Sequence, residues 1–543
     1  MTARPWQAAA VAVLSAVVVV AVASRSGQSF YSDPALQMKT ALQFVAGESP
    51  RPNTWVRPDH ADLARSTEEN LIVWAPGSAI AFVPLVRAGL TPARAARAIA
   101  AVALLAGSAG WLVWFASFSL PRPVAFAYAL VLPWMRFASN APFLYTPEIL
   151  SFAIVPWVLV AALAVDRAPR NRVVGAVAVG LAAGSLYVVK YSATFVTAGV
   201  LVWFAWRVAN KPAAKEGRRP CWQLAAAVVG AAVPIVLLSR LNQQYGGSPN
   251  LLSASFGIGW RWENLVHAVA LPALAAADLD SLSMYVLMHP THGITANSFY
   301  LSLVGLPGGV LLVVLAARSR VISAPAALAR IVLGVSICAM LLVWALSSVV
   351  SVEARHLASA GMAALPLAIA EGHRWWRTAA APLRTLLAVT ACAFIIVPLS
   401  YGVVSVLAKT FRYPAGYRAG ASGIYNPLLS KHDAASAVEE LTQDFTPATD
   451  VWYLIEPLTA LDLPGRALIR HADFIELAIL QRERFFTSGR LHVHVLLPPR
   501  FEQNGKGPAI RASFPQATAW ARREIADAEY VSWTALLEPA HGE

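Results

Sequence analysis

Residues 7–34 read QAAAVAVLSAVVVVAVASRSGQSFYSDP, and this stretch decides the fold. An apolar run comes first, and an acid, Asp33, follows roughly ten residues after the run ends, directly before Pro34. At least nine more apolar stretches follow along the chain. Runs of roughly 17–22 apolar residues are long enough to cross the hydrocarbon core of a bilayer as helices. We therefore predict a polytopic α-helical membrane protein with an acid just outside its first span.

The composition supports a membrane protein. The chain has 543 residues, of which 57% are hydrophobic and 13% charged, and its mean hydropathy is +0.54. Soluble proteins are usually about 25% charged, so the soluble two- or three-domain protein that the length alone would allow is excluded. Cys221, Cys338 and Cys392 lie in or beside apolar runs without metal-ligand spacing. We expect no disulfide framework.

The net charge of +13 reflects the membrane topology of the chain and does not indicate a nucleic-acid partner. Most basic residues fall in short segments between apolar runs, at 87–97, 167–172, 207–219, 318–320 and 374–384. Such segments face the cytoplasm by the positive-inside rule. We therefore expect the N-terminus inside, and 240–298, the region of Glu353 and everything after about 408 outside. The first 23 residues also resemble a cleavable signal peptide, which is the alternative to a first span.

The expected spans make up a transmembrane module at 1–407, with about 11–13 crossings. They lie at roughly 7–24, 71–89, 98–116, 123–138, 148–165, 173–189, 191–206, 222–239, 299–317, 329–350, 356–371 and 385–407. Two large outside loops are expected at 25–70, with a short interfacial helix at 34–45, and at 240–298. Because three full crossings within 98–165 conflict with the charge pattern, we expect 123–138, which Pro133 interrupts, to be short or re-entrant.

A small α/β domain is expected at 430–543, outside the membrane and after a linker at 408–429. Residues 451–455 and 492–497 have the pattern of buried strands, and 434–441, 474–484 and 517–528 that of helices. A region of about 110 residues is long enough to bury a core of its own.

Five short patterns occur in a fixed order over roughly residues 1–400. They are Phe30-Tyr31-Ser32-Asp33; Trp74-Ala75-Pro76-Gly77 with Phe82-Val83-Pro84-Leu85; Tyr145-Thr146-Pro147-Glu148; Gly184-Ser185-Leu186 with Lys190-Tyr191-Ser192; and Glu353-Ala354-Arg355-His356-Leu357 with Ala364-Leu365-Pro366-Leu367. Together they resemble the GT-C superfamily of membrane glycosyltransferases, in its protein-mannosyltransferase and aminoarabinose-transferase branch. His356 stands where that family usually has Tyr, and the acid pair often seen in the first motif is Asp33-Pro34 here.

The resemblance implies inverting transfer of a sugar from a polyprenyl-phosphate donor to a lipid, glycan or protein acceptor, on the outer face of the cytoplasmic membrane. An acceptor hydroxyl needs a base, and Asp33 is the expected one. A departing phosphate needs cations, and we expect Lys190 and Arg355 to bind it, Arg355 through its bidentate fork. Glu148, and Glu353 beside Arg355, are the other expected substrate-binding residues of these motifs.

Each of these residues also has a purely structural interpretation. Asp33 and Glu148, next to prolines, have the pattern of helix caps. Lys190 is placed to extend its amine to the membrane interface, and Arg355 to form an ion pair with Glu353 that is worth little at a surface. Rival outside acids in the first loop are Asp59, Asp62, Glu68 and Glu69.

His289 and His292 are expected to line the substrate site from the loop at 240–298. Two histidines three residues apart also suit a metal, but no third ligand accompanies them, so the need for a divalent cation stays open. His471, His492 and His494 in the C-terminal region show no catalytic spacing, and we interpret them as structural.

Two other classes of function compete with the enzyme. A transporter or lipid flippase predicts paired repeats and charges at mid-membrane, and the sequence shows neither. A membrane scaffold whose tail binds a partner gives Asp33, Lys190 and Arg355 no reason to converge. The enzyme hypothesis requires that these three residues and Glu148 line one outward-facing cavity.

Overall fold

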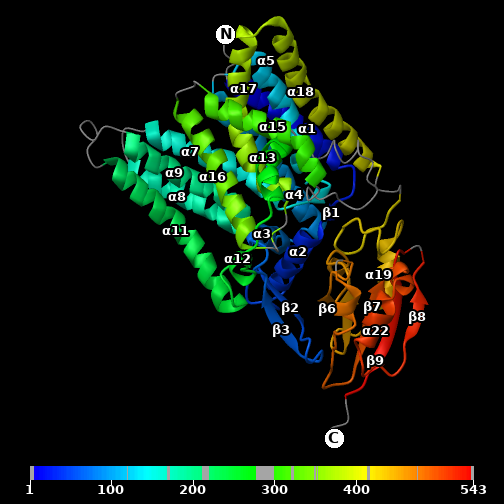
Figure 1. Ribbon diagram of the computed structural model, residues 1–543. Helices are drawn as coiled ribbons and strands as arrows, with labels where there is room; N and C mark the ends of the chain where they lie inside the picture. The colour runs from blue at the N-terminus through cyan, green and yellow to red at the C-terminus, as the bar shows by residue number, and fades with distance from the viewer. Residues whose placement is uncertain are drawn as a thin grey trace.

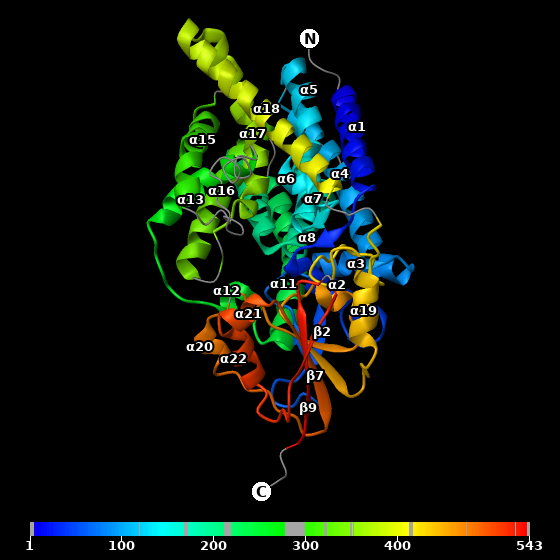
Figure 2. The same ribbon diagram turned by 90° about the vertical axis from the view of Figure 1, so that its right-hand side faces the viewer.

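The protein consists of a helical bundle with an α/β region docked at one end. The computed structural model describes residues 5–118, 120–167, 172–210, 219–276, 299–319, 323–347, 350, 352–411, 416–473, 475–526 and 528–539. Figures 1 and 2 show the helices filling one half of the molecule and the C-terminal sheet, in orange and red, lying beyond α2 at the other end.

Long apolar helices make up the bundle. Within the described residues, six have the length and composition to cross a membrane: α4 (Pro92–Ala116), α7 (Glu148–Arg167), α8 (Arg172–Val189), α9 (Thr194–Asn210), α11 (Arg219–Gly246) and α16 (Ala324–Leu346). The others are α1 (Pro5–Ala23), α3 (Gly77–Arg87), α5 (Arg122–Val131), α6 (Arg136–Ser139), α12 (Leu251–Ala254), α13 (Glu263–Ala276), α15 (Phe299–Arg318), α17 (Ala358–Thr378) and α18 (Ala381–Thr410). The predicted polytopic helical fold is confirmed.

Glycines allow α8 and α11 to pack backbone against backbone. A Cβ atom on Gly180 would overlap the carbonyl of Ala227, and one on Gly184 would overlap that of Ala231. Small residues four apart give this kind of close helix packing in membrane proteins. Gly184 belongs to the fourth sequence motif, so the motif serves packing at this position.

A short parallel pairing joins the first loop to the start of α7. Strand β1 (Ser29–Phe30) pairs with β4 (Leu144–Tyr145), with Phe30 opposite Tyr145. Helix α2 (Ser32–Val45) follows β1 and confirms the helix predicted in this loop. A hairpin of β2 (Thr54–Pro58) and β3 (Ser66–Asn70) completes the loop.

Two expected segments differ from the structure. The helix within 71–89 covers only Gly77–Arg87, about 17 Å at 1.5 Å per residue, so it is too short to span and packs against α2 instead. The apolar segment in the sequence is longer than the helix. Its first residues lead out of the β2–β3 hairpin, and Gly89, at φ +83°, ends the helix. The expected loop at 240–298 holds the end of α11, then α12 and α13, and α13 packs against α15 and α17.

The break expected near Pro133 is present. Helix α5 ends at Val131, a single 3-10 turn η1 (Leu132–Trp134) follows, and the short α6 comes next. Proline removes a backbone donor and clashes with the preceding turn, which ends the α-helix at this point.

The C-terminal region is a five-stranded sheet with short helices. The strand order is β6 (Arg466–Ile469), β5 (Asp450–Leu454), β7 (Leu491–Leu497), β9 (Val531–Leu537) and β8 (Ala521–Glu524). Strand β5 lies parallel to both β6 and β7, whereas β9 runs antiparallel to β7 and β8. The helices are α19 (Ala434–Thr442), α20 (Leu477–Leu480), α21 (Arg500–Gln503) and α22 (Lys506–Ala512).

Two of the helices expected in this region are wrong in whole or part. Residues 517–528 contain the edge strand β8, not a helix, and within 474–484 only Leu477–Leu480 is helical. All four residues of β8 are exposed, so the sequence carries no burial pattern there, and pairing with β9 decides the conformation.

The C-terminal region shares a core with the first loop. Leu36, Trp55, Leu63 and Leu71 pack in the same hydrophobic cluster as the sheet. Backbone hydrogen bonds tie the two parts, from Leu63 N to Phe486 O at 2.8 Å and from Tyr425 N to Gln28 O at 2.9 Å. The region is therefore held against the loop that carries Asp33.

Candidate active site

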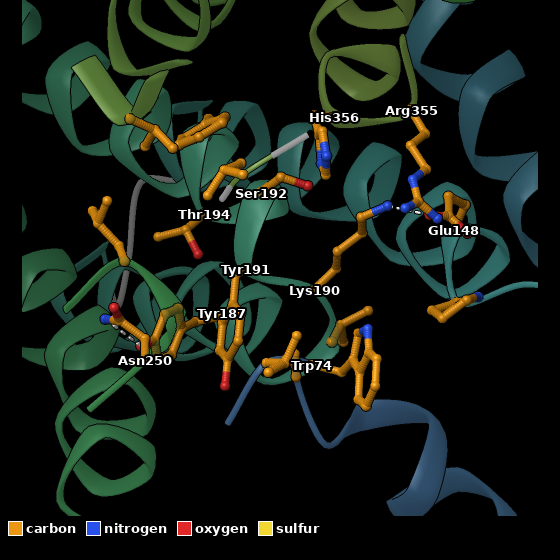
Figure 3. A pocket seen from close by; sticks show the side chains of 18 of the residues that line it. Trp74, Glu148, Tyr187, Lys190, Tyr191, Ser192, Thr194, Asn250, Arg355 and His356 are labelled. Carbon is orange, nitrogen blue, oxygen red and sulfur yellow. Dashed lines mark hydrogen bonds and ion pairs between the residues drawn. The ribbon is translucent and has the colours of Figure 1, made fainter. Parts of the chain in front are cut away.

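A cavity of about 480 Å³ lies where the first loop meets the bundle. Asp33, Glu148, Lys190 and Arg355, all predicted site residues, line it together. They come from four separate parts of the chain: α2, the start of α7, the break between α8 and α9, and the turn η3 (Ala354–His356). Figure 3 shows Glu148, Lys190 and Arg355 converging at one end of this cavity.

The β1–β4 pairing places the two acids. Phe30 and Tyr145 face each other in register, and Asp33 and Glu148 each come three residues later, in the first turn of a helix. The Phe82 ring packs against both paired aromatics, with centroids 6.0 Å from Phe30 and 5.0 Å from Tyr145. The first and third sequence motifs are thus two halves of one local structure.

Asp33 is not the cap of its helix. The N-cap of α2 is Tyr31, which makes no side-chain cap hydrogen bond. Asp33 and Trp74 line the same cavity. Burial raises the pKa of Asp33 above its ordinary value, and the positive charge of Arg355 opposes part of that rise. A carboxyl with a raised pKa is a stronger base once ionised.

Lys190 lies in a break between two helices. Its backbone is extended, at φ −162° and ψ 128°, between the end of α8 and the turn η2 (Tyr191–Ala193). Helix α3 begins against this break, because a Cβ on Gly77 would lie only 2.7 Å from the Val189 Cα. The Lys190 amine forms an ion pair with Glu148. The side chain is thus held inside the cavity rather than extended to a membrane surface.

Arg355 contacts two acids. Its guanidinium donates to Glu353 at 3.1 Å and lies 3.5 Å from Glu148 Oε1. The Glu353 pair was the structural alternative for Arg355, and it coexists with the position in the cavity. Arg355 is 40% exposed, compared with 11% for Glu148, so part of its fork of N–H donors remains accessible to a ligand.

His356 adds two buried ring nitrogens to which the sequence interpretation assigned no role. Both of its ring nitrogens are buried, and neither has a hydrogen-bond partner among the residues that the structure describes. Figure 3 shows the ring close to Ser192, on the side of the cavity that holds Lys190. A second cavity of about 30 Å³, lined by Trp111, Ser151 and His356, adjoins the ion pairs. Its volume suffices for ordered water.

The other end of the large cavity is aromatic and polar. The rings of Tyr187 and Tyr191 lie 4.9 Å apart, and the amides of Asn250 and Asn242 donate to their hydroxyls at 3.2 and 3.1 Å. Figure 3 shows Tyr187, Tyr191 and Asn250 grouped away from Arg355. Tyr191 lies within the fourth motif, but its spacing alone gave it no role.

Several candidates lie elsewhere. Glu353 is outside the cavity wall and holds Arg355. Among the rival acids, Asp62 binds Ser488, while Glu68 and Glu69 pair with Arg51 and Arg57. His289 and His292 lie outside the described residues. Nowhere in the described ranges do three His, Cys, Asp or Glu side chains group closely enough to hold a metal.

The C-terminal histidines have two kinds of surroundings. His492 and His494 flank the buried Asp450, at 3.4 and 3.2 Å. His471, in contrast, lies within electrostatic range of Asp33. The sequence interpretation took His471 as structural, because the docking of the C-terminal sheet on α2 is a tertiary contact that no local pattern shows.

The fold is shared with a solved membrane protein: the chain has the fold of ArnT. The solved structure of ArnT from Cupriavidus metallidurans bound to undecaprenyl phosphate matches it with a TM-score of 0.50 at 12% identity, over 96% of this chain and 97% of that chain. ArnT from the same organism in the apo state matches with a TM-score of 0.47 at 13% identity, over the same shares. No protein-family model and no curated protein sequence matches this chain.

Proposed function

We propose that this protein transfers a sugar from a polyprenyl-phosphate donor to a hydroxyl-bearing acceptor. The observation that carries the proposal is the convergence of Asp33, Glu148, Lys190 and Arg355 on one cavity of about 480 Å³. The same fold in ArnT, whose structure contains undecaprenyl phosphate, supports the donor class.

The cavity offers separate surfaces for the parts of such a donor. Arg355 and Lys190 bind the phosphate, and Glu148 keeps both cations in place. Phe195, Met340 and Val343 form an apolar wall against which an isoprenoid chain can pack. The hydroxyl and amide groups near Tyr187 and Tyr191 are suited to a polar headgroup.

The proposed reaction is a single displacement with inversion. The acceptor oxygen attacks the anomeric carbon while the bond from that carbon to the phosphate oxygen breaks. The bonding pair leaves with the polyprenyl phosphate, whose added charge Arg355 and Lys190 stabilise. Asp33 takes the hydroxyl proton as the new bond forms.

The proposed location is the cytoplasmic membrane, with the cavity and the C-terminal sheet on the outer face. The basic segments between apolar runs favour the N-terminus inside. The acceptor is then a lipid, glycan or protein that reaches the outer face.

The test is sugar transfer by the purified protein with a panel of polyprenyl-phosphate sugars. Asp33→Asn should abolish transfer while thermal unfolding stays as in the wild type. Asp59→Asn, which changes an acid outside the cavity wall, is the matched control and should transfer normally. Wild-type transfer by the Asp33 variant would remove Asp33 from the mechanism, and no transfer with any donor would reject the proposed function.

A further inference from the structure

The C-terminal sheet touches the helix that carries Asp33 at defined points. Ser32 Oγ donates to Glu456 Oε2 at 2.8 Å, and Lys39 Nζ donates to the carbonyl of Ala460 at 3.0 Å. Figures 1 and 2 both show α2 lying beside the end of the C-terminal sheet. Ser32 therefore links α2, which carries the proposed base Asp33, to Glu456 of the C-terminal region.

The hydrogen bond from Ser32 to Glu456 lies at the N-terminal end of α2. The N-cap residue Tyr31 provides no side-chain hydrogen bond to the first turn, although side-chain caps usually stabilise helix starts. Ser32 is the next residue, and Asp33 follows it directly. Holding the Ser32 side chain from outside the helix restricts the turn on which Asp33 lies.

Glu456 also brings charge to the neighbourhood of Asp33. It follows strand β5 by two residues, and its carboxyl is within electrostatic range of Asp33 and His471. The other charged groups that face Asp33 are Arg355 from η3 and Glu148 from α7. Burial raises the pKa of Glu456, as it does that of Asp33. Like charges held close together disfavour each other's ionised form.

We propose that Glu456 is a positioning residue for Asp33: it holds the first turn of α2 through Ser32 and places a second carboxyl against the residue that precedes the base. The C-terminal region then helps to position the base, in addition to covering the site. This inference rests on the proposed function, in which Asp33 accepts the proton.

Two substitutions separate the two effects of Glu456. Ser32→Ala removes the hydrogen bond and keeps the charge, so kcat should fall about five- to tenfold, with the pH profile in place. Ser32→Thr keeps a hydroxyl and should restore most of the activity. Glu456→Gln can still accept from Ser32 but removes the negative charge, so the acid limb of the pH profile should move to lower pH. Glu524→Gln, on the exposed strand β8, is the charge-matched control.

The measurements are sugar-transfer rates against pH, with thermal unfolding to show that each variant is folded. A wild-type rate in Ser32→Ala, or an unchanged acid limb in Glu456→Gln, would overturn the inference while leaving the proposed function intact. A shift of the same size in Glu524→Gln would also overturn it, because the effect would then be one of net charge. Absence of transfer in the wild type with every donor would reject the proposed function and this inference together.

Discussion

Replacing Glu148 by Gln should cost more stability than replacing Lys190 by Met, although the two residues form one ion pair. Both side chains are nearly buried, at 11% and 14% exposure. Glu148 is the partner of both Lys190 and Arg355, so the Gln variant leaves two cations without it. Removing one member of a buried pair costs about 3–5 kcal/mol. Release of the lysine proton limits that cost.

Lys190→Met leaves Glu148 with Arg355 3.5 Å away, so we expect a loss of about 1–3 kcal/mol. The assay is thermal or denaturant unfolding in detergent for both variants and for the double variant. The double variant should lose at least about 1 kcal/mol less than the sum of the single losses, because the two residues share one interaction. Additive losses, or a smaller loss for Glu148→Gln than for Lys190→Met, would refute the buried ion pairs of Glu148 with Lys190 and Arg355.

Three further outcomes follow from the site. Burial raises the pKa of Asp33, and the base must be ionised to accept a proton. We therefore expect kcat/KM to reach its maximum above that raised pKa and to fall as the pH drops through it. An acid limb in the ordinary Asp range would contradict the assignment of Asp33 as the base. Arg355→Lys keeps the charge but loses the bidentate fork, so the KM for the donor should rise about tenfold with unfolding unchanged, and an unaltered KM would exclude a phosphate contact. Gly77→Val should lower both the Tm and the transfer rate, since its Cβ would lie 2.7 Å from Val189 Cα. Gly257→Ala, whose Cβ would meet no atom of the described residues within 4 Å, should be neutral.

The sequence predicts the membrane fold well because apolar length is a local property. The helix at the start of the first loop and the break at Pro133 are also local, and both are present. Helix α3 was predicted too long: only Gly77–Arg87 is helical, and this short helix packs on α2. Strand β8 was missed because its exposed residues show no alternation, and only pairing with β9 defines it.

The same distinction holds for the site. The motifs led to Asp33, Glu148, Lys190 and Arg355, and the structure brings all four to one cavity. Their chemical roles stay predictions. Trp74 was quoted only as part of a motif, and neither Glu456 nor His471 stands out by spacing. Their positions beside Asp33 depend on how the hairpin, α2 and the C-terminal sheet pack, which no local pattern encodes.

The parallel pairing of Phe30 with Tyr145 limits which changes in chain length the protein can tolerate. A residue inserted between Phe30 and Asp33 would turn the carboxylate by about 100° around α2 and move it about 1.5 Å along the axis, so its position relative to Glu148 would change. An insertion in the turn at 46–53, beyond the helix, leaves that geometry unchanged. The spacing of three residues from Phe30 to Asp33, and from Tyr145 to Glu148, is thus fixed. A chimaera that exchanges one of these two segments with another protein should keep both spacings equal.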